Sequence, residues 1–160
     1  MLPAAAQRDS LQLDLSKLDD TLRGGAAPLP AFRSALQEAH EAQRQRFLSG
    51  APVEELLRQR AALLDELLTR AWRLHSPPAQ AALVAARGYG RAELHPGSDI
   101  DLLILTAEDS TETQAIERFV HFLWDIGLHL GHSVRTIAEC RSEAARDVTV
   151  LTALLESRWL

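Results

Sequence analysis

The sequence lacks the features that define several common classes of protein. Cys140 is the only cysteine among 160 residues, so no disulfide can form within the chain, which favours a reducing compartment such as the cytoplasm. No uninterrupted apolar run approaches the roughly 18 residues that cross a bilayer. Residues 1–9 lack the basic start and apolar core of a signal peptide. We therefore expect a cytoplasmic protein that does not associate with membranes.

Basic residues and several familiar motifs are also scarce. The 22 Asp and Glu outnumber the 17 Lys and Arg, which gives a net charge of −5. A nucleic-acid-binding protein generally presents a basic face, so we expect no nucleic acid partner. The sequence shows no zinc-type Cys/His cluster, no phosphate-binding Gly-Lys loop and no legible Ser-His-Asp arrangement. The hydrophobic content of 46% is nevertheless sufficient for a core.

The most informative segment joins a glycine-rich turn to an apolar strand. The sequence Gly-Tyr-Gly-Arg at residues 88–91 precedes Asp99 and Asp101, which lead into four aliphatic residues at 102–105. Such a run predicts a strand covered on both faces. Because strand side chains alternate, Asp99 and Asp101 share one face, where two carboxylates favour a cation such as Mg²⁺. Glycine lets backbone N–H groups approach phosphate, so the segment predicts a site for a metal-bound nucleoside triphosphate.

This segment resembles the signature of the DNA-polymerase-β-type nucleotidyltransferase superfamily. Ten residues separate Gly88 from Asp99. The amino-acid sequence of residues 88–103 resembles that of bacterial PII uridylyltransferase/uridylyl-removing enzymes, as do residues 123–125 and 131–136. The resemblance extends from about residue 56 to the end. It implies an α+β fold in which a small mixed sheet is flanked by helices. It also implies Mg²⁺ as cofactor, UTP as substrate and transfer of UMP to a tyrosine of a PII-type regulatory protein by a two-metal mechanism.

The resemblance assigns roles to particular residues. Asp99 and Asp101 match the metal-binding and catalytic carboxylates. A third carboxylate usually comes from a later strand, for which Glu156 is the candidate and Asp147 the rival. The residues that match the nucleotide-binding turn and its approach to the strand are Gly88, Tyr89, Gly90, Arg91 and Ser98.

Alternatives stay open at several of these positions. The Ser98 hydroxyl either reaches a phosphate or caps the turn. Arg91 either neutralises triphosphate charge or pairs with an acid such as Glu93. His132 and Arg135, on a strand expected at residues 128–134, could both face the cleft.

Two departures from the family pattern bear on activity. Arg87 and Ala92 stand where the family usually has glycine. Arg87 either contacts phosphate itself or crowds the site. A catalytically degenerate nucleotide-binding module and an adenylyltransferase of the same superfamily therefore remain as alternative functions.

The sequence divides into three expected regions. We expect an arm or linker at 1–30, a helical segment at 31–75 and the nucleotidyltransferase core at 76–160. The resembled enzymes are longer and no His-Asp dipeptide occurs here, so we expect a fragment that holds only the transferase part. Helical periodicity predicts helices within 31–49 and 53–72, and residues 148–160 fit either a helix or a strand. Further strands are expected at 81–86 and 99–106, and capping boxes at Thr111 with Gln114 and at Thr136 with Glu139.

Overall fold

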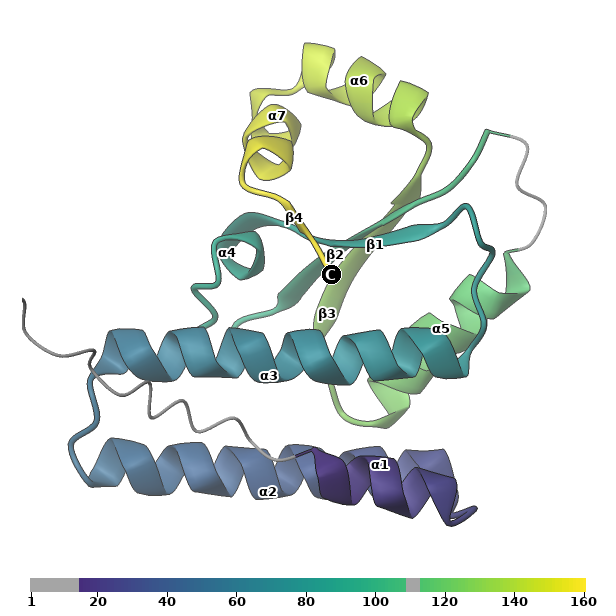
Figure 1. Ribbon diagram of the computed structural model, residues 1–160. Coiled ribbons are helices and arrows are strands. Elements are labelled where there is room, and N and C mark those ends of the chain that lie inside the picture. Colours follow the sequence, from purple (N-terminus) through teal and green to yellow (C-terminus); the bar gives the residue numbers. More distant parts are fainter. Residues whose placement is uncertain (1–14, 109–112) are drawn as a thin grey trace, which may run out of the picture.

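The computed structural model describes residues 15–108 and 113–160. These ranges contain seven helices and four short strands, whose arrangement Figure 1 shows. In chain order the elements are α1 (Ser16–Arg23), α2 (Pro28–Leu48), α3 (Val53–Leu74), β1 (Ala82–Ala85), α4 (Arg87–Gly90), β2 (Ile100–Leu105), α5 (Gln114–Asp125), β3 (Leu130–Arg135), α6 (Ile137–Arg146), α7 (Val148–Leu155) and β4 (Arg158–Trp159).

The strands form one open mixed sheet in the order β3-β2-β1-β4. β2 pairs with β3 in parallel, whereas β1 pairs antiparallel with both β2 and β4. The parallel pair needs a crossover, which α5 provides, and the antiparallel pairs leave β1 and β2 joined through the α4 turn. This architecture confirms the predicted α+β fold with a small mixed sheet flanked by helices.

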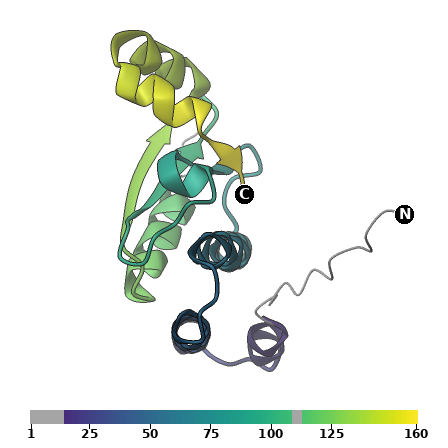
Figure 2. The ribbon, with the colours of Figure 1, turned by 90° about the vertical axis from the view of Figure 1, so that its left-hand side faces the viewer.

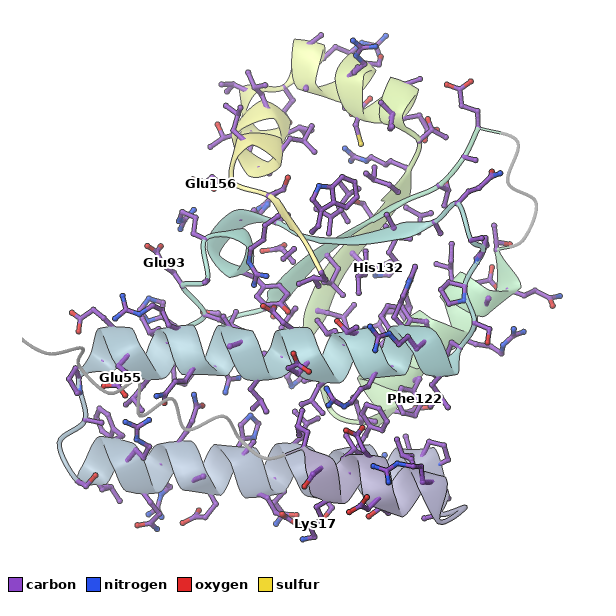
Figure 3. The ribbon with its side chains drawn as sticks, viewed as in Figure 1. Lys17, Glu55, Glu93, Phe122, His132 and Glu156 are labelled. Carbon is purple, nitrogen blue, oxygen red and sulfur yellow. The ribbon has the colours of Figure 1, made fainter. Side chains whose placement is uncertain are left out.

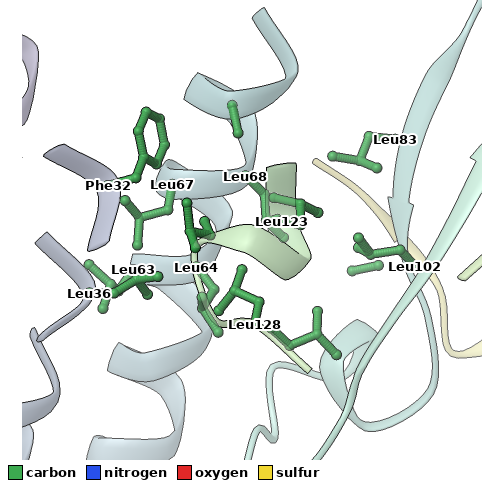
Figure 4. Packing of buried hydrophobic residues seen from close by; sticks show 14 of the residues in the cluster. Phe32, Leu36, Leu63, Leu64, Leu67, Leu68, Leu83, Leu102, Leu123 and Leu128 are labelled. Atoms are coloured by element: carbon green, nitrogen blue, oxygen red, sulfur yellow. The ribbon is translucent and has the colours of Figure 1, made fainter. Parts of the chain in front are cut away.

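One hydrophobic cluster joins the helical segment to the sheet. Its members include Phe32 of α2, Leu67 of α3, Leu102 of β2 and Leu123 of α5, all buried. Figure 4 shows this packing, and Figure 2 shows that α3 lies between α2 and the sheet. The prediction that the apolar stripe of residues 53–72 covers the sheet is therefore confirmed for α3, while α2 forms an outer layer.

The two faces of the sheet have different roles. Ile100, Leu102 and Ile104 of β2 belong to the main cluster under α3 and α5. Because side chains alternate, Asp101 and Leu103 point to the opposite face. There Leu103 packs with the buried Cys140 of α6, and Leu154 of α7 covers them. α6 and α7 thus cover the face of the sheet to which Asp101 points.

The structure differs from the sequence prediction mainly at the chain's edges. Residues 16–23 form α1 within the expected arm, with Leu18 buried, and α2 begins at Pro28 because proline suits the first helical turn. Residues 148–160 resolve into both alternatives, a helix followed by the edge strand β4. The capping box of Thr136 with Glu139 is confirmed by hydrogen bonds of 3.1 and 2.8 Å. The one expected at Thr111 lies outside the described residues.

No helix in the described part of the chain combines the length and hydropathy that a transmembrane span requires.

Candidate active site

The Asp101 carboxylate sits where β2 enters the sheet, beside a glycine of the neighbouring strand. Asp101 pairs in register with Gly131 of β3, and a Cβ atom on Gly131 would lie 3.2 Å from Asp101 Oδ1. A side chain at this position would therefore press on the carboxylate. The sequence reasoning missed this role of Gly131, because it depends on the strand register.

Asp101 lines a cavity of about 240 Å³ between the sheet and α7. Its other lining residues include Arg87 of α4, Gly131, Ser133 and Arg135 of β3, and Val150, Ala153 and Leu154 of α7. Its lining combines a carboxylate, two guanidinium groups and a hydroxyl, a donor set that suits a charged ligand rather than an apolar one.

The charges around Asp101 are unevenly balanced. Burial raises the pKa of the half-buried Asp101 carboxyl, Arg87 opposes this rise, and the neighbouring Asp99 adds to it. Asp99 and Ser98 are exposed at the strand entrance. The charge of Asp99 therefore disfavours ionisation of Asp101, and Arg87 supplies a cation that favours it.

Glu156, the predicted third carboxylate, is engaged elsewhere. Its Oε2 lies 2.7 Å from Arg91 Nη1, and Arg91 Nε donates to Glu93 Oε2 at 2.9 Å. Figure 3 shows Glu93 and Glu156 both beside α4. Across residues 15–108 and 113–160, no three His, Cys, Asp or Glu side chains converge in a way that could hold a metal ion. The structure therefore brings Asp99 and Asp101 together without a third carboxylate.

Asp147, the rival, occupies the N-cap position of α7. Its carboxylate caps α7 by accepting the Thr149 N–H at 2.7 Å. Hydrogen bonds from Thr149 hold the pKa of Asp147 below its usual range, and the charge of Arg87 contributes to the same shift. Arg87 thus interacts electrostatically with both Asp101 and Asp147.

Tyr89 needs a correction. Its side chain is buried in the core, and its hydroxyl donates to Asp65 of α3 at 2.6 Å. Arg158 of β4 clamps the same carboxylate through two nitrogens, each at 2.8 Å. Burial, followed by the charge of Asp65, raises the pKa of Tyr89 far above its ordinary range. The phenol is therefore unavailable to a nucleotide, and only the backbone of Tyr89 stays in the prediction.

Gly90 has a packing reason to be glycine. A Cβ atom there would lie 2.1 Å from the Glu156 carbonyl oxygen and 3.1 Å from that of Ala85. At Gly88 the corresponding approach, to the Glu93 carbonyl, is 3.3 Å. The contact at Gly90 lets the segment between α7 and β4 lie directly against α4. A role of these glycines in holding phosphate stays a prediction.

His132 and Arg135, which were both expected to face the cleft, point to opposite faces of the sheet. Arg135 shares the face of Asp101, since residues 101 and 131 pair in register and 135 follows at an even spacing. The His132 ring instead stacks edge-on with Trp124 of α5 at a centroid distance of 5.6 Å. Alternation along a strand gives the two side chains opposite orientations, so the His132 ring points away from Asp101, although His132 is among the residues that line the cavity.

The two departures from the family glycine pattern coincide with unusual backbone. Arg87 has φ of 54° and Ala92 has φ of 58°. This left-handed region costs an L-residue about 1–2 kcal/mol, and glycine enters it freely. The backbone conformation of the turn therefore favours glycine at both positions, whereas this chain has an arginine and an alanine there.

We expect glycine at either position to relieve this strain. Compared with Arg87→Ala, which removes the cation but keeps the strain, Arg87→Gly should raise the free energy of unfolding by about 1 kcal/mol. Ala92→Gly, which changes no charge, should stabilise the parent chain by a similar amount. Urea denaturation of the three variants measures both differences. Equal stability of Arg87→Ala and Arg87→Gly would show that this position carries no strain.

A mixed sheet whose buried strand opens with Asp-x-Asp, next to a tight glycine turn, is the framework of a nucleotidyltransferase. The comparison with protein families agrees, because residues 37–144 match the family described as "Putative nucleotidyltransferase DUF294". The chain belongs to this family.

Curated relatives narrow the comparison. The chain is 50% identical over 138 residues to a bifunctional uridylyltransferase/uridylyl-removing enzyme of Nitrosococcus oceani. It is 46% identical over 156 residues to an enzyme of the same name from Pseudomonas fluorescens. These matches cover 84% and 95% of this chain, but only 16% and 17% of the two relatives. The chain thus spans about a sixth of their length.

Proposed function

We propose that this domain transfers UMP from UTP to a tyrosine of a PII-type nitrogen regulatory protein. The observation that carries the proposal is the pair Asp99 and Asp101 at the entrance of a buried strand, beside a charged cavity. Identity to enzymes named uridylyltransferase supports the choice of UTP. In this reaction the tyrosine oxygen bonds to the α-phosphorus, the bond from that phosphorus to the bridging oxygen breaks, and pyrophosphate leaves.

The residues at the site fit a magnesium ion. Asp99 and Asp101 offer carboxylate oxygens, the ligands that Mg²⁺ prefers, and because burial raises the pKa of Asp101, a bound cation would favour its ionised form. When bound, Mg²⁺ neutralises triphosphate charge and stabilises the attacking and leaving oxygens. The protein itself contributes position and charge, which is most of what phosphoryl-type transfers require.

Other residues complete the proposed site. The backbone of Gly88 and Tyr89 holds phosphate, whereas the Gly90 N–H, also predicted to do so, already donates to the Ala86 carbonyl oxygen at 2.9 Å. Ser98 adds a hydroxyl at the strand entrance. Arg91 exchanges its pairs with Glu93 and Glu156 for the triphosphate, which frees Glu156 to act as the third carboxylate and accept the tyrosine proton. Asp147 is the alternative for this role, because it shares the Arg87 cation with Asp101.

A second function is favoured by Arg87. Arg87 lines the same cavity as Asp101, and its charge already favours the ionised carboxylate, as a metal ion would. A nucleotide-binding module without transfer activity would retain UTP binding and lose turnover. The same fold would also accommodate an adenylyltransferase, which would prefer ATP.

Calorimetry and a transfer assay distinguish these functions. We expect UTP to bind at least tenfold more tightly than ATP in the presence of Mg²⁺, and labelled UMP to appear on a PII-type protein. The same protein with its acceptor tyrosine replaced by phenylalanine is the control. Tighter binding of ATP would indicate adenylyl transfer, and UTP binding without labelling would indicate the inactive module. Absence of binding by any nucleotide would refute the proposal.

A further inference from the structure

A second cavity, which shares no lining residue with the Asp101 cavity, lies between α2, α3 and the turn at residues 95–97. Its volume is about 430 Å³, within the range of small-molecule pockets. The apolar walls come from Phe47, Val53, Leu56 and Leu57. Phe47 and Val53 are 59% and 48% exposed, respectively, although both are large apolar side chains.

The charged residues of this cavity are all basic. His40, Arg44, Arg60 and His95 line it, and within the described part of the chain no Asp or Glu belongs to its lining. This is unexpected in a chain whose acidic residues outnumber its basic ones by 22 to 17. The cavity therefore combines an apolar body with local positive charge.

Arg60 is a half-buried cation of this cavity for which residues 15–108 and 113–160 provide no ion pair. Its Nε is buried without a hydrogen-bond partner among the described residues, and its Nη1 makes a long contact of 3.4 Å with Gln43 Oε1. Other half-buried arginines are paired: Arg46 with Glu55 at 2.6 Å and Arg70 with Asp19 at 2.8 Å. Burial lowers the pKa of the Arg60 guanidinium.

His40 lies close enough to Arg60 to sense its charge. Burial lowers the pKa of the His40 imidazole, and the Arg60 charge lowers it further. A half-buried cation without a partner is costly, because burial removes part of its hydration. An anion in the cavity would offset this cost.

We propose that this cavity binds a small organic anion, with a carboxylate or phosphate head on Arg60 and an aliphatic body against Phe47, Val53 and Leu57. The head forms charge-assisted hydrogen bonds with the unpaired guanidinium edge. The body covers the exposed apolar wall. This site is separate from the proposed nucleotide site and does not depend on uridylyl transfer.

Octanoate is the probe, with octanol as its neutral counterpart and octyl phosphate to compare the two head groups. We expect calorimetry to show that octanoate or octyl phosphate binds at least tenfold more tightly than octanol. Arg60→Met should weaken anion binding at least tenfold, whereas Arg60→Lys should retain most of it. Arg58→Met, an exposed position on the same helix, is the matched control and should leave binding unchanged.

The outcomes separate the proposal from a merely apolar cavity. Arg60→Met should fold, because it removes an unpaired buried charge and keeps the side-chain length; its thermal unfolding checks this. Equal affinity for octanol and octanoate would overturn the proposal, as would unchanged anion binding in Arg60→Met. Failure of all three probes to bind the parent chain would overturn it as well. None of these results involves UTP, so they leave the proposed transfer function untouched.

Discussion

Asp99→Asn and Asp101→Asn are each expected to abolish Mg²⁺-dependent UTP binding while the domain stays folded. Loss of an outer partner of a metal ligand typically weakens a site 10- to 100-fold, so loss of a ligand itself should weaken it by at least about 100-fold. Asparagine keeps the shape of aspartate and removes the charge. Calorimetry with UTP at fixed Mg²⁺ measures the effect, and Asp125→Asn, an exposed acid at the end of α5, is the control.

The stability of the Asp101→Asn variant should change in the opposite direction from its binding. Because the folded-state pKa of Asp101 is raised, its protonated form is favoured by folding, and that contribution is complete below the unfolded pKa of about 3.9 and lost as the pH rises. At neutral pH the charged carboxylate therefore lowers the free energy of unfolding, and asparagine removes this charge. Urea denaturation should show a larger gain for the variant at pH 7 than at pH 4. Loss of the unfolding transition would instead make Asp101 structural.

Mg²⁺ binding should depend on pH for the same reason. The ion requires the ionised carboxylate, so metal affinity should fall as the pH is lowered through the raised pKa of Asp101. Titration of Mg²⁺ at several pH values measures this dependence.

Gly90→Ala should be the most destabilising single-methyl change in the glycine turn. The new Cβ would lie 2.1 Å from the Glu156 carbonyl oxygen, a backbone atom that cannot rotate away. Either α4 or the segment between α7 and β4 must shift, and we expect a loss of about 3 kcal/mol, at the upper end for overpacked sites. Chemical denaturation measures the loss.

Gly24→Ala is the matched control for this change. At Gly24 the nearest atom to a new Cβ is 3.4 Å away and the backbone φ is −72°, so alanine fits without strain. Its stability should stay within about 0.5 kcal/mol of the parent. A Gly90→Ala variant as stable as this control would show that the segment between α7 and β4 is free to move away from α4.

Periodic and local signals made much of the fold predictable. The aliphatic run at 102–105, the stripe on α3 and the capping box at Thr136 each involve neighbours within a few residues, and the structure confirms all three. Residues 148–160 carried both a helical and an alternating pattern, and only the pairing of β4 with β1 assigns the last residues to the sheet.

The rest of the site depends on contacts between distant residues. α1 contacts the core through Leu18 and Leu22, a helical spacing that spans only eight residues within the segment expected to be an arm. The burial of Tyr89 follows from Asp65, which lies 24 positions earlier in the chain. Similarly, the engagement of Glu156 by Arg91 and the space that Gly131 leaves for Asp101 arise only when the strands and α4 are assembled.

The Asp65 carboxylate has a consequence for how the molecule can be cut. Asp65 belongs to α3, which precedes the sheet in the chain. It accepts hydrogen bonds from the Tyr89 phenol and from the Arg158 guanidinium of β4. A truncation that begins at residue 76 would leave Tyr89 and Arg158 without their shared acceptor and would uncover the apolar side of β1 and β2. Although we expected a boundary between the helical segment and the core at residues 75–76, these contacts couple the two. We therefore expect α3 and the sheet to unfold together in a single thermal transition.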